Sequence, residues 1–248
     1  MKNLILLIAL SITTQLSIAQ SSGIISFLST EKFEIKMDNV PEGVDLSGML
    51  PTSRSATKEL IFNKNESVYI DGKEDVEDTE LTSDDGSFKM VIMESDIESR
   101  LYNNIKTKRS VSQEDFMGKA FIIEDKMPKY NWKLTKEKIK FLGYECTKAT
   151  TTNEKDEEIV AWFAPAIKTQ AGPDGYGQLP GAILMFSLND GKIEIKATKV
   201  ELKEVNKIEI PNDGKKVTGE EFKKIIEEKI KEMKKEYGGN GHNIEIRG

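Results

Sequence analysis

Short runs in which apolar and polar residues alternate, separated by polar turns, fill the second half of this 248-residue chain. The runs 147–152 and 159–164 flank the charged turn 153–158. Further along, the tight turn 189–191 joins the apolar run 183–188 to a long alternating run. Side chains of a strand point alternately to its two faces, and turns this short join antiparallel neighbours. The pattern therefore predicts an antiparallel sheet.

The first half of the chain adds more predicted strands. We expect strands at 24–27 and 33–37, followed by a loop or a short helix over 39–57, where the apolar residues show no sustained period. The runs 60–62 and 67–70 flank a polar tetrad and predict a hairpin. Further strands or turns are predicted at 88–93, 100–108 and 119–123.

Gly143 marks a point where the alternation slips by one residue. Phe141 lies on one face of the predicted strand, but the apolar set that follows consists of Leu142, Tyr144 and Cys146. Glycine inside a strand pattern is typical of a bulge or a tight bend. We therefore expect the strand to be bulged or bent at Gly143.

Two features of the region 159–181 bear on a binding site. Trp162 and Phe163 fall on opposite faces of their strand, so one is expected in the core and the other on a concave face or an interface. The glycine-rich loop 168–181 lacks the residues of a phosphate-binding loop. Its Gly and Pro residues are better explained by backbone turns, although a loop at the rim of a sheet also suits a ligand.

The C-terminal part of the chain predicts a helix. Thr218 and Glu221 form a capping-box pair, apolar residues recur at three- and four-residue steps over 222–237, and two glycines stop the pattern. The polar face mixes both charges, which favours docking on the sheet over a partner-binding or membrane-surface helix. The predicted fold class is α+β and mostly antiparallel β: a curved, half-barrel-like sheet with a C-terminal amphipathic helix packed on it.

The first twenty residues predict the compartment. One positive charge is followed by the apolar run 4–10 and a small-x-small ending at Ala19, which is typical of a secretory signal peptide over 1–19. The apolar run is shorter than the roughly 20 residues that span a bilayer, so we expect cleavage near Ala19 rather than an uncleaved membrane anchor. The mature protein is then a periplasmic or secreted single domain over 20–237, without stable membrane insertion, followed by a flexible tail over 238–248.

The composition limits the partners and the kinds of site that we expect. The formal charge is −6 and the 36 Lys and Arg residues are scattered among 42 acids, which argues against a nucleic-acid partner. Cys146, the only cysteine, is expected to be a small buried side chain, because the only histidine, His242, lies in the Gly-rich tail. The acidic segment 71–87 lacks the spacing of a calcium loop and is interpreted as a solvated loop, with calcium binding left open. No metal, cofactor or catalytic residue is predicted.

Several segments together resemble the GLPGLI family. The segments that carry the resemblance are 23–27, 60–63, 66–69, 132–135, 143–149 and 161–163, with the naming motif at 178–183. The motif reads Gln-Leu-Pro-Gly-Ala-Ile here, so two of its six positions depart, and the turn 153–156 lacks the arginine typical of the family. The resemblance implies an envelope or secreted protein, and it carries over no catalytic residue.

Three functions remain open, in order of preference. The first is a non-catalytic binding protein that holds an apolar small molecule or a lipid-modified partner in the concave sheet, under the helix. The second is a protein-protein interaction module of the cell envelope, which would bind another envelope protein through its glycine-rich loop and strand edges. The third is a hydrolase based on carboxylates. The candidate binding residues are Trp162, Phe163, Tyr176, Leu179, Pro180 and Gly181.

Overall fold

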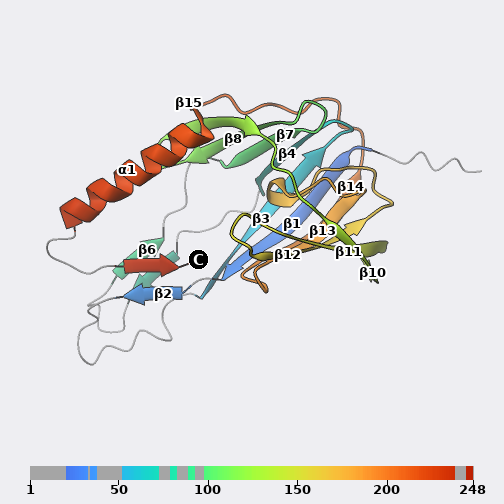
Figure 1. The fold of residues 1–248 in the computed structure, drawn as a ribbon, viewed down its shortest axis with the longest axis horizontal. Coiled ribbons are helices and arrows are strands. Elements are labelled where there is room, and N and C mark those ends of the chain that lie inside the picture. The colour runs from blue at the N-terminus through green and yellow to red at the C-terminus, as the bar shows by residue number, and fades with distance from the viewer. Residues whose placement is uncertain are drawn as a thin grey trace, which may run out of the picture.

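One large open sheet organises the molecule (Figure 1). The computed structural model describes residues 21–32, 34–37, 52–72, 79–82, 89–92, 98–237 and 244–247. Within them, twelve strands pair in the order β10-β11-β12-β13-β14-β1-β3-β4-β7-β8-β9-β15. Neighbouring described strands are antiparallel, except that β15 runs parallel to β9. The expected α+β fold, mostly antiparallel with a C-terminal helix, is confirmed.

Most strands that are neighbours in this sheet are also consecutive along the chain, and few long connections join them. The first six are β1 (Gly23–Lys32), β3 (Ser53–Phe62), β4 (Glu66–Asp71), β7 (Arg100–Asn104), β8 (Arg109–Asp115) and β9 (Ala120–Lys126). The other six are β10 (Lys133–Phe141), β11 (Tyr144–Thr152), β12 (Glu158–Ala164), β13 (Ala182–Leu188), β14 (Ile193–Leu202) and β15 (Lys215–Thr218).

Two small sheets of two strands each accompany the large one. β2 (Glu34–Met37) pairs with β16 (Ile244–Arg247), and β5 (Thr79–Thr82) pairs with β6 (Lys89–Ile92). β16 lies in the segment expected as a C-terminal tail, so part of that segment forms a strand.

Several predictions fall on residues that the structure does not describe. These residues include the signal peptide 1–19, most of the acidic segment 71–87, and His242. In the part of the chain that is described, no helix has the length and apolar character needed to cross a membrane.

The main core lies on one face of the sheet, which we call the inner face. Alternation in β1 and β3 turns Ile25, Phe27 and Leu60 toward this face, and all three are fully buried. The loop between β12 and β13 folds onto the same face, where Ile167 and Leu179 join the cluster. The glycine-rich loop, and not the helix, therefore covers this part of the sheet.

The opposite, outer face carries a second and smaller core. Val68, Tyr102, Val111 and Ile122 alternate with the inner-face residues of their strands and pack together there. Ile208, from the segment between β14 and β15, is also buried in this cluster. The sheet is thus covered on both faces by chain segments that lack long regular structure.

The predicted hairpin around 63–66 is confirmed as the β3–β4 connection. At Gly143, however, the expected bulge or bend is wrong. Leu142 has φ 47° and Gly143 has φ 83°, and Phe141 lies directly opposite Tyr144, so these two residues form the turn of the β10–β11 hairpin. The alternation slips there because the chain reverses direction.

Two further expectations need correction. β3 begins at Ser53, so residues 53–57 form a strand where a loop or a short helix was expected; residues 39–51 lie outside the described part. β8 was not predicted at all. Its sequence holds a single strongly apolar residue, Val111, and its strand conformation is stabilised by pairing with β7 and β9 on either side.

Helix α1 (Gly219–Tyr237) begins where the sequence predicts it. The Glu221 N–H donates to Thr218 Oγ1 at 3.2 Å, and the Thr218 N–H donates to Glu221 Oε2 at 2.7 Å, which confirms the capping box. The Phe222 ring packs against Phe121 and Phe116, with centroids 5.1 and 6.1 Å apart. Figure 1 shows the helix starting at the β15 end of the sheet and running outward from it, so the helix contacts an edge and not the middle.

Candidate functional site

A hollow of about 190 Å³ opens on the inner face, next to the glycine-rich loop. We call it the inner hollow, and its walls come from the tip of the loop and from strands β1, β3, β4, β7, β8 and β14. The lining residues are Ser29, Glu31, Lys58, Tyr69, Ile70, Ser99, Leu101, Glu114, Asp174, Ile193 and Ile195.

Asp174 is held in the inner hollow by the 3-10 turn η1 (Pro173–Gly175), which packs on β4 and β7. Its backbone has φ 49°, a left-handed conformation that aspartate adopts more readily than most residues. Asp174 is an exposed residue, although neighbouring protein atoms crowd its carboxyl group. This burial, with a smaller contribution from Glu31, raises the pKa of Asp174 to about 6, against the opposing effect of Lys58.

A second carboxyl group in the hollow is also displaced from its usual range. Burial raises the pKa of Glu114, and the Asp174 charge adds to this effect, while a hydrogen bond from Ser112 opposes it. Among the described residues that line the hollow, Lys58 is the basic one, and it forms an ion pair with Asp71. Asp71 also accepts a hydrogen bond from the Ser99 N–H at 2.9 Å. The carboxylates of the hollow thus outnumber its cation.

Tyr69 supplies a buried polar group at the same place. The residue is 8% exposed, and its ring packs edge-on against Phe27 with centroids 6.2 Å apart. Its hydroxyl finds no hydrogen-bond partner among the described residues. Burial first, and then the charges of Asp174 and Asp71, raise the pKa of this phenol, so it stays protonated. An unpaired buried hydroxyl costs about 1–3 kcal/mol, which a ligand hydrogen bond would recover.

The loop that carries Asp174 is tightly packed. A Cβ atom added at Gly172, Gly177 or Gly181 would lie 1.7, 2.4 or 2.3 Å from a backbone carbonyl oxygen. The Trp132 indole N–H donates to the Gly177 carbonyl at 2.8 Å, and the Gln178 N–H donates to the Gln170 carbonyl at 2.7 Å. These contacts agree with the structural role expected for the glycines, and they fix the position of Asp174.

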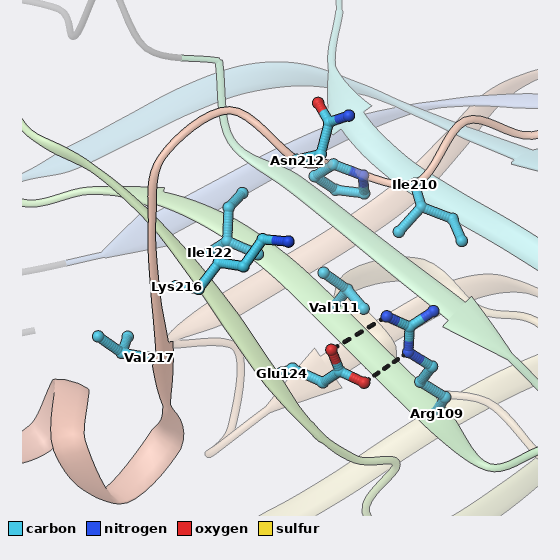
Figure 2. Close-up of a pocket in the computed structure, with 9 residues that line it drawn as sticks. Arg109, Val111, Ile122, Glu124, Ile210, Asn212, Lys216 and Val217 are labelled. Atoms are coloured by element: carbon cyan, nitrogen blue, oxygen red, sulfur yellow. Dashed lines mark hydrogen bonds and ion pairs between the residues drawn. The ribbon is translucent and has the colours of Figure 1, made fainter.

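A second hollow, of about 200 Å³, lies on the outer face between β8, β9 and the segment 210–217. Figure 2 shows the Arg109–Glu124 pair at one end of this outer hollow and Val217 at the other. Arg109 Nε and Nη2 donate to Glu124 at 2.7 and 3.0 Å. Arg109 and Glu124 neutralise each other, and Lys216 adds a positive charge to the lining of the outer hollow.

Comparison with known proteins assigns the fold to a family. The family model described as "N-glycanase peptide, N-terminal domain" matches residues 60–225. The chain belongs to this family. Two solved structures of PNGF-II, one in space group P21 and one in C2, both match with a TM-score of 0.51, at 17% and 18% sequence identity. No curated protein sequence matches.

The match to PNGF-II is one-sided. It covers 82% of this chain but 33% and 32% of the two PNGF-II chains. The chain therefore spans about a third of the length of the PNGF-II chains. At these identities the likeness shows the fold alone. The resemblance to the GLPGLI family stays a prediction beside this assignment.

None of the six residues singled out from the sequence is among the described residues that line the inner hollow of this member of the N-glycanase N-terminal domain family. Phe163 and Leu179 are buried in the core, Gly181 is buried, and Pro180 is exposed. Trp162 is half-buried, with Lys148 Nζ 6.0 Å from its ring centroid.

Tyr176 is the predicted residue nearest in sequence to the inner hollow. Its ring packs against Phe186 and Tyr130, with centroids 4.3 and 5.2 Å apart. The described lining of the hollow contains Asp174, from the same turn, in place of Tyr176. The sequence prediction selected the loop that borders the hollow, but it did not select Asp174, the side chain of that loop that lines it. The Pro173-Asp174-Gly175 turn signal was the available clue.

Cys146 is fully buried, and burial raises the pKa of its thiol to about 11. The thiol is therefore neutral near pH 7 and unsuited to nucleophilic chemistry. Among the described residues, no group of three or more His, Cys, Asp or Glu side chains is arranged to hold a metal ion.

Proposed function

We propose that this chain is a non-catalytic binding domain of a secreted or envelope protein, and that its inner hollow receives a polar group of a carbohydrate-bearing ligand. The observation that carries the proposal is that Tyr69, whose hydroxyl is unpaired among the described residues, lines one hollow together with Asp174 and Glu114. Binding sites typically combine apolar walls with a few convergent polar groups. The name of the family, N-glycanase, supports a glycan as the ligand class.

The size of the inner hollow limits what it holds. Its volume of about 190 Å³ is below the roughly 300–1,000 Å³ typical of pockets that enclose a whole drug-sized ligand. It therefore suits one ring or one substituent at the end of a longer ligand. Leu101, Ile193 and Ile195 supply apolar walls on which the C–H face of a sugar ring would pack.

An apolar ligand or a lipid-modified partner is a weaker proposal for the same face. The aromatic and aliphatic side chains expected to line an apolar cavity, Phe163 and Leu179, are instead packed within the main core. The glycine-rich loop fills the space above them. A long hydrocarbon chain would have to displace this loop.

A carboxylate-based hydrolase is the second candidate, because one observation favours it. Asp174 and Glu114 line one hollow, and a carboxyl group with a pKa of about 6 is suited to donate a proton near neutral pH. Turnover separates the two candidates. A hydrolase releases product from a glycoside or a glycopeptide, and Asp174→Asn would abolish that release, whereas a binding domain leaves the ligand intact.

The binding proposal is tested by titrating the purified protein with N-glycans and glycopeptides in a calorimeter. Tyr69→Phe removes the unpaired hydroxyl and keeps the ring, so it should weaken binding about tenfold without loss of stability. Tyr144→Phe, on a half-buried tyrosine away from the hollow, is the matched control. Saturable binding that Tyr69→Phe leaves unchanged, or no binding to any glycan, would contradict the proposal.

A further inference from the structure

The inner hollow carries an excess of negative charge. Glu31, Glu114 and Asp174 line it, and the ammonium group of Lys58 is already paired with Asp71. The repulsion affects both acids: the Asp174 charge contributes to the raised pKa of Glu114, and the Glu31 charge contributes to the raised pKa of Asp174. A positive charge placed between them would remove this repulsion.

Tyr69 provides independent evidence that a ligand group belongs in the hollow. The residue is more than nine-tenths buried and lines the hollow, and its hydroxyl lacks a hydrogen-bond partner within the described part of the chain. A phenol oxygen accepts a hydrogen bond from an N–H group, while its own proton can be donated to a carboxylate. The hydroxyl thus complements a donor-rich cation beside Asp174.

We propose that the group received by the inner hollow is a protonated primary amine, as carried by an unacetylated amino sugar. This inference rests on the proposed function, because it names the chemistry of the ligand that the binding domain takes. An ammonium group has three N–H donors. Asp174, Glu114 and the Tyr69 hydroxyl are the three acceptors that would receive them.

Neutral and metallic alternatives fit the hollow less well. A sugar hydroxyl would pair with Tyr69 but leave the repulsion between Glu114 and Asp174 in place. A bound metal ion needs a compact set of ligands, and the described residues hold no such group of three. A primary ammonium ion is a compact charge that needs no fixed coordination geometry.

The test compares three sugars that differ at one substituent. Glucosamine, N-acetylglucosamine and glucose are titrated at pH 7.0 into the ¹⁵N-labelled full-length mature protein, and amide shifts are followed by NMR. Glucosamine is expected to bind at least ten times more tightly than the other two, with shifts at Tyr69, Leu101 and Asp174. Asp174→Asn and Glu114→Gln should each reduce this preference at least tenfold.

Asp190→Asn is the matched control, because Asp190 is exposed and also has a left-handed backbone, with φ 52°. It should leave the preference for glucosamine unchanged. Equal affinity for the three sugars would overturn the amine inference and leave the carbohydrate-binding function standing. Binding of ethanolamine at the hollow without binding of any sugar would support the amine inference and overturn the carbohydrate ligand. Absence of binding by all four probes would overturn both.

Discussion

At the scale of single residues, Asp174 combines a left-handed backbone with a carboxyl group whose pKa is raised to about 6 by burial. In the unfolded chain the same group has the ordinary value of 3.8. The folded protein therefore holds the proton more tightly than the unfolded chain between these two values. The contribution of Asp174 to stability is most favourable below about pH 4 and declines as the pH rises to about 6 and beyond.

Asp174→Asn should consequently stabilise the protein at pH 7.5 and leave its stability unchanged at pH 4. The expected gain is roughly 1 kcal/mol in the free energy of unfolding, because solvent contact reduces the effect of the full pKa shift. Urea unfolding at the two pH values measures it. Asp190→Asn controls for the effect of asparagine in a left-handed backbone. An equal gain for both variants, or an equal gain at both pH values, would contradict the electrostatic explanation.

Cys146 gives a second prediction at this scale. The side chain is fully buried and the pKa of its thiol is about 11, so the folded protein should react with iodoacetamide far more slowly than the unfolded chain at pH 8. Mass spectrometry of the protein with and without urea measures the two rates. Rapid alkylation without urea would show that the strand β11 opens locally.

At the scale of elements, the glycine-rich loop depends on close contacts between backbone atoms. Gly181→Ala would place a methyl group 2.3 Å from the Ala164 carbonyl oxygen and should lower the free energy of unfolding by at least about 3 kcal/mol. Gly118→Ala has open space around the added carbon and should cost about 1 kcal/mol, from its left-handed backbone alone. Urea unfolding of the two variants checks the order. Similar losses would mean that the loop can shift to accommodate a side chain.

Helix α1 is attached to the sheet through its first turns. Phe222→Ala removes the ring that packs on Phe121 and Phe116. We expect the free energy of opening of the helix amides to fall by about 2 kcal/mol, so that these amides exchange faster, while the amides of the sheet stay protected. Hydrogen exchange followed by NMR measures this. Ile230→Ala is the control, because Ile230 is 46% exposed and should change exchange little. Unchanged helix protection in Phe222→Ala would place the docking elsewhere.

The elements that the sequence predicts well are those with local signals. The β3–β4 hairpin has a polar tetrad between apolar runs, and the start of α1 has its Thr218–Glu221 pair. β8 was missed because its stability comes from two neighbouring strands and not from its own pattern. The inner hollow was missed for a similar reason. Asp174 and Glu114 are 60 positions apart, and only the folding of the loop onto the inner face brings them together.

At the scale of the whole molecule, the two ends of the open sheet are covered differently. The glycine-rich loop closes the inner face over β12, β13 and β1, and the first turns of α1 contact the edge at β9 and β15. The inner hollow lies where the tip of the loop reaches β4 and β7. The structural match covers about a third of each PNGF-II chain, so about two thirds of those chains lie outside it.

The most direct test of the central claim, that the inner hollow is the ligand site, is NMR shift mapping with an N-glycan or an amino sugar on the ¹⁵N-labelled protein. The account predicts saturable shifts centred on Tyr69, Leu101, Glu114 and Asp174. Saturable shifts centred instead on the outer hollow, at Arg109, Ile122 and Val217, would contradict it. So would a spectrum that no carbohydrate changes.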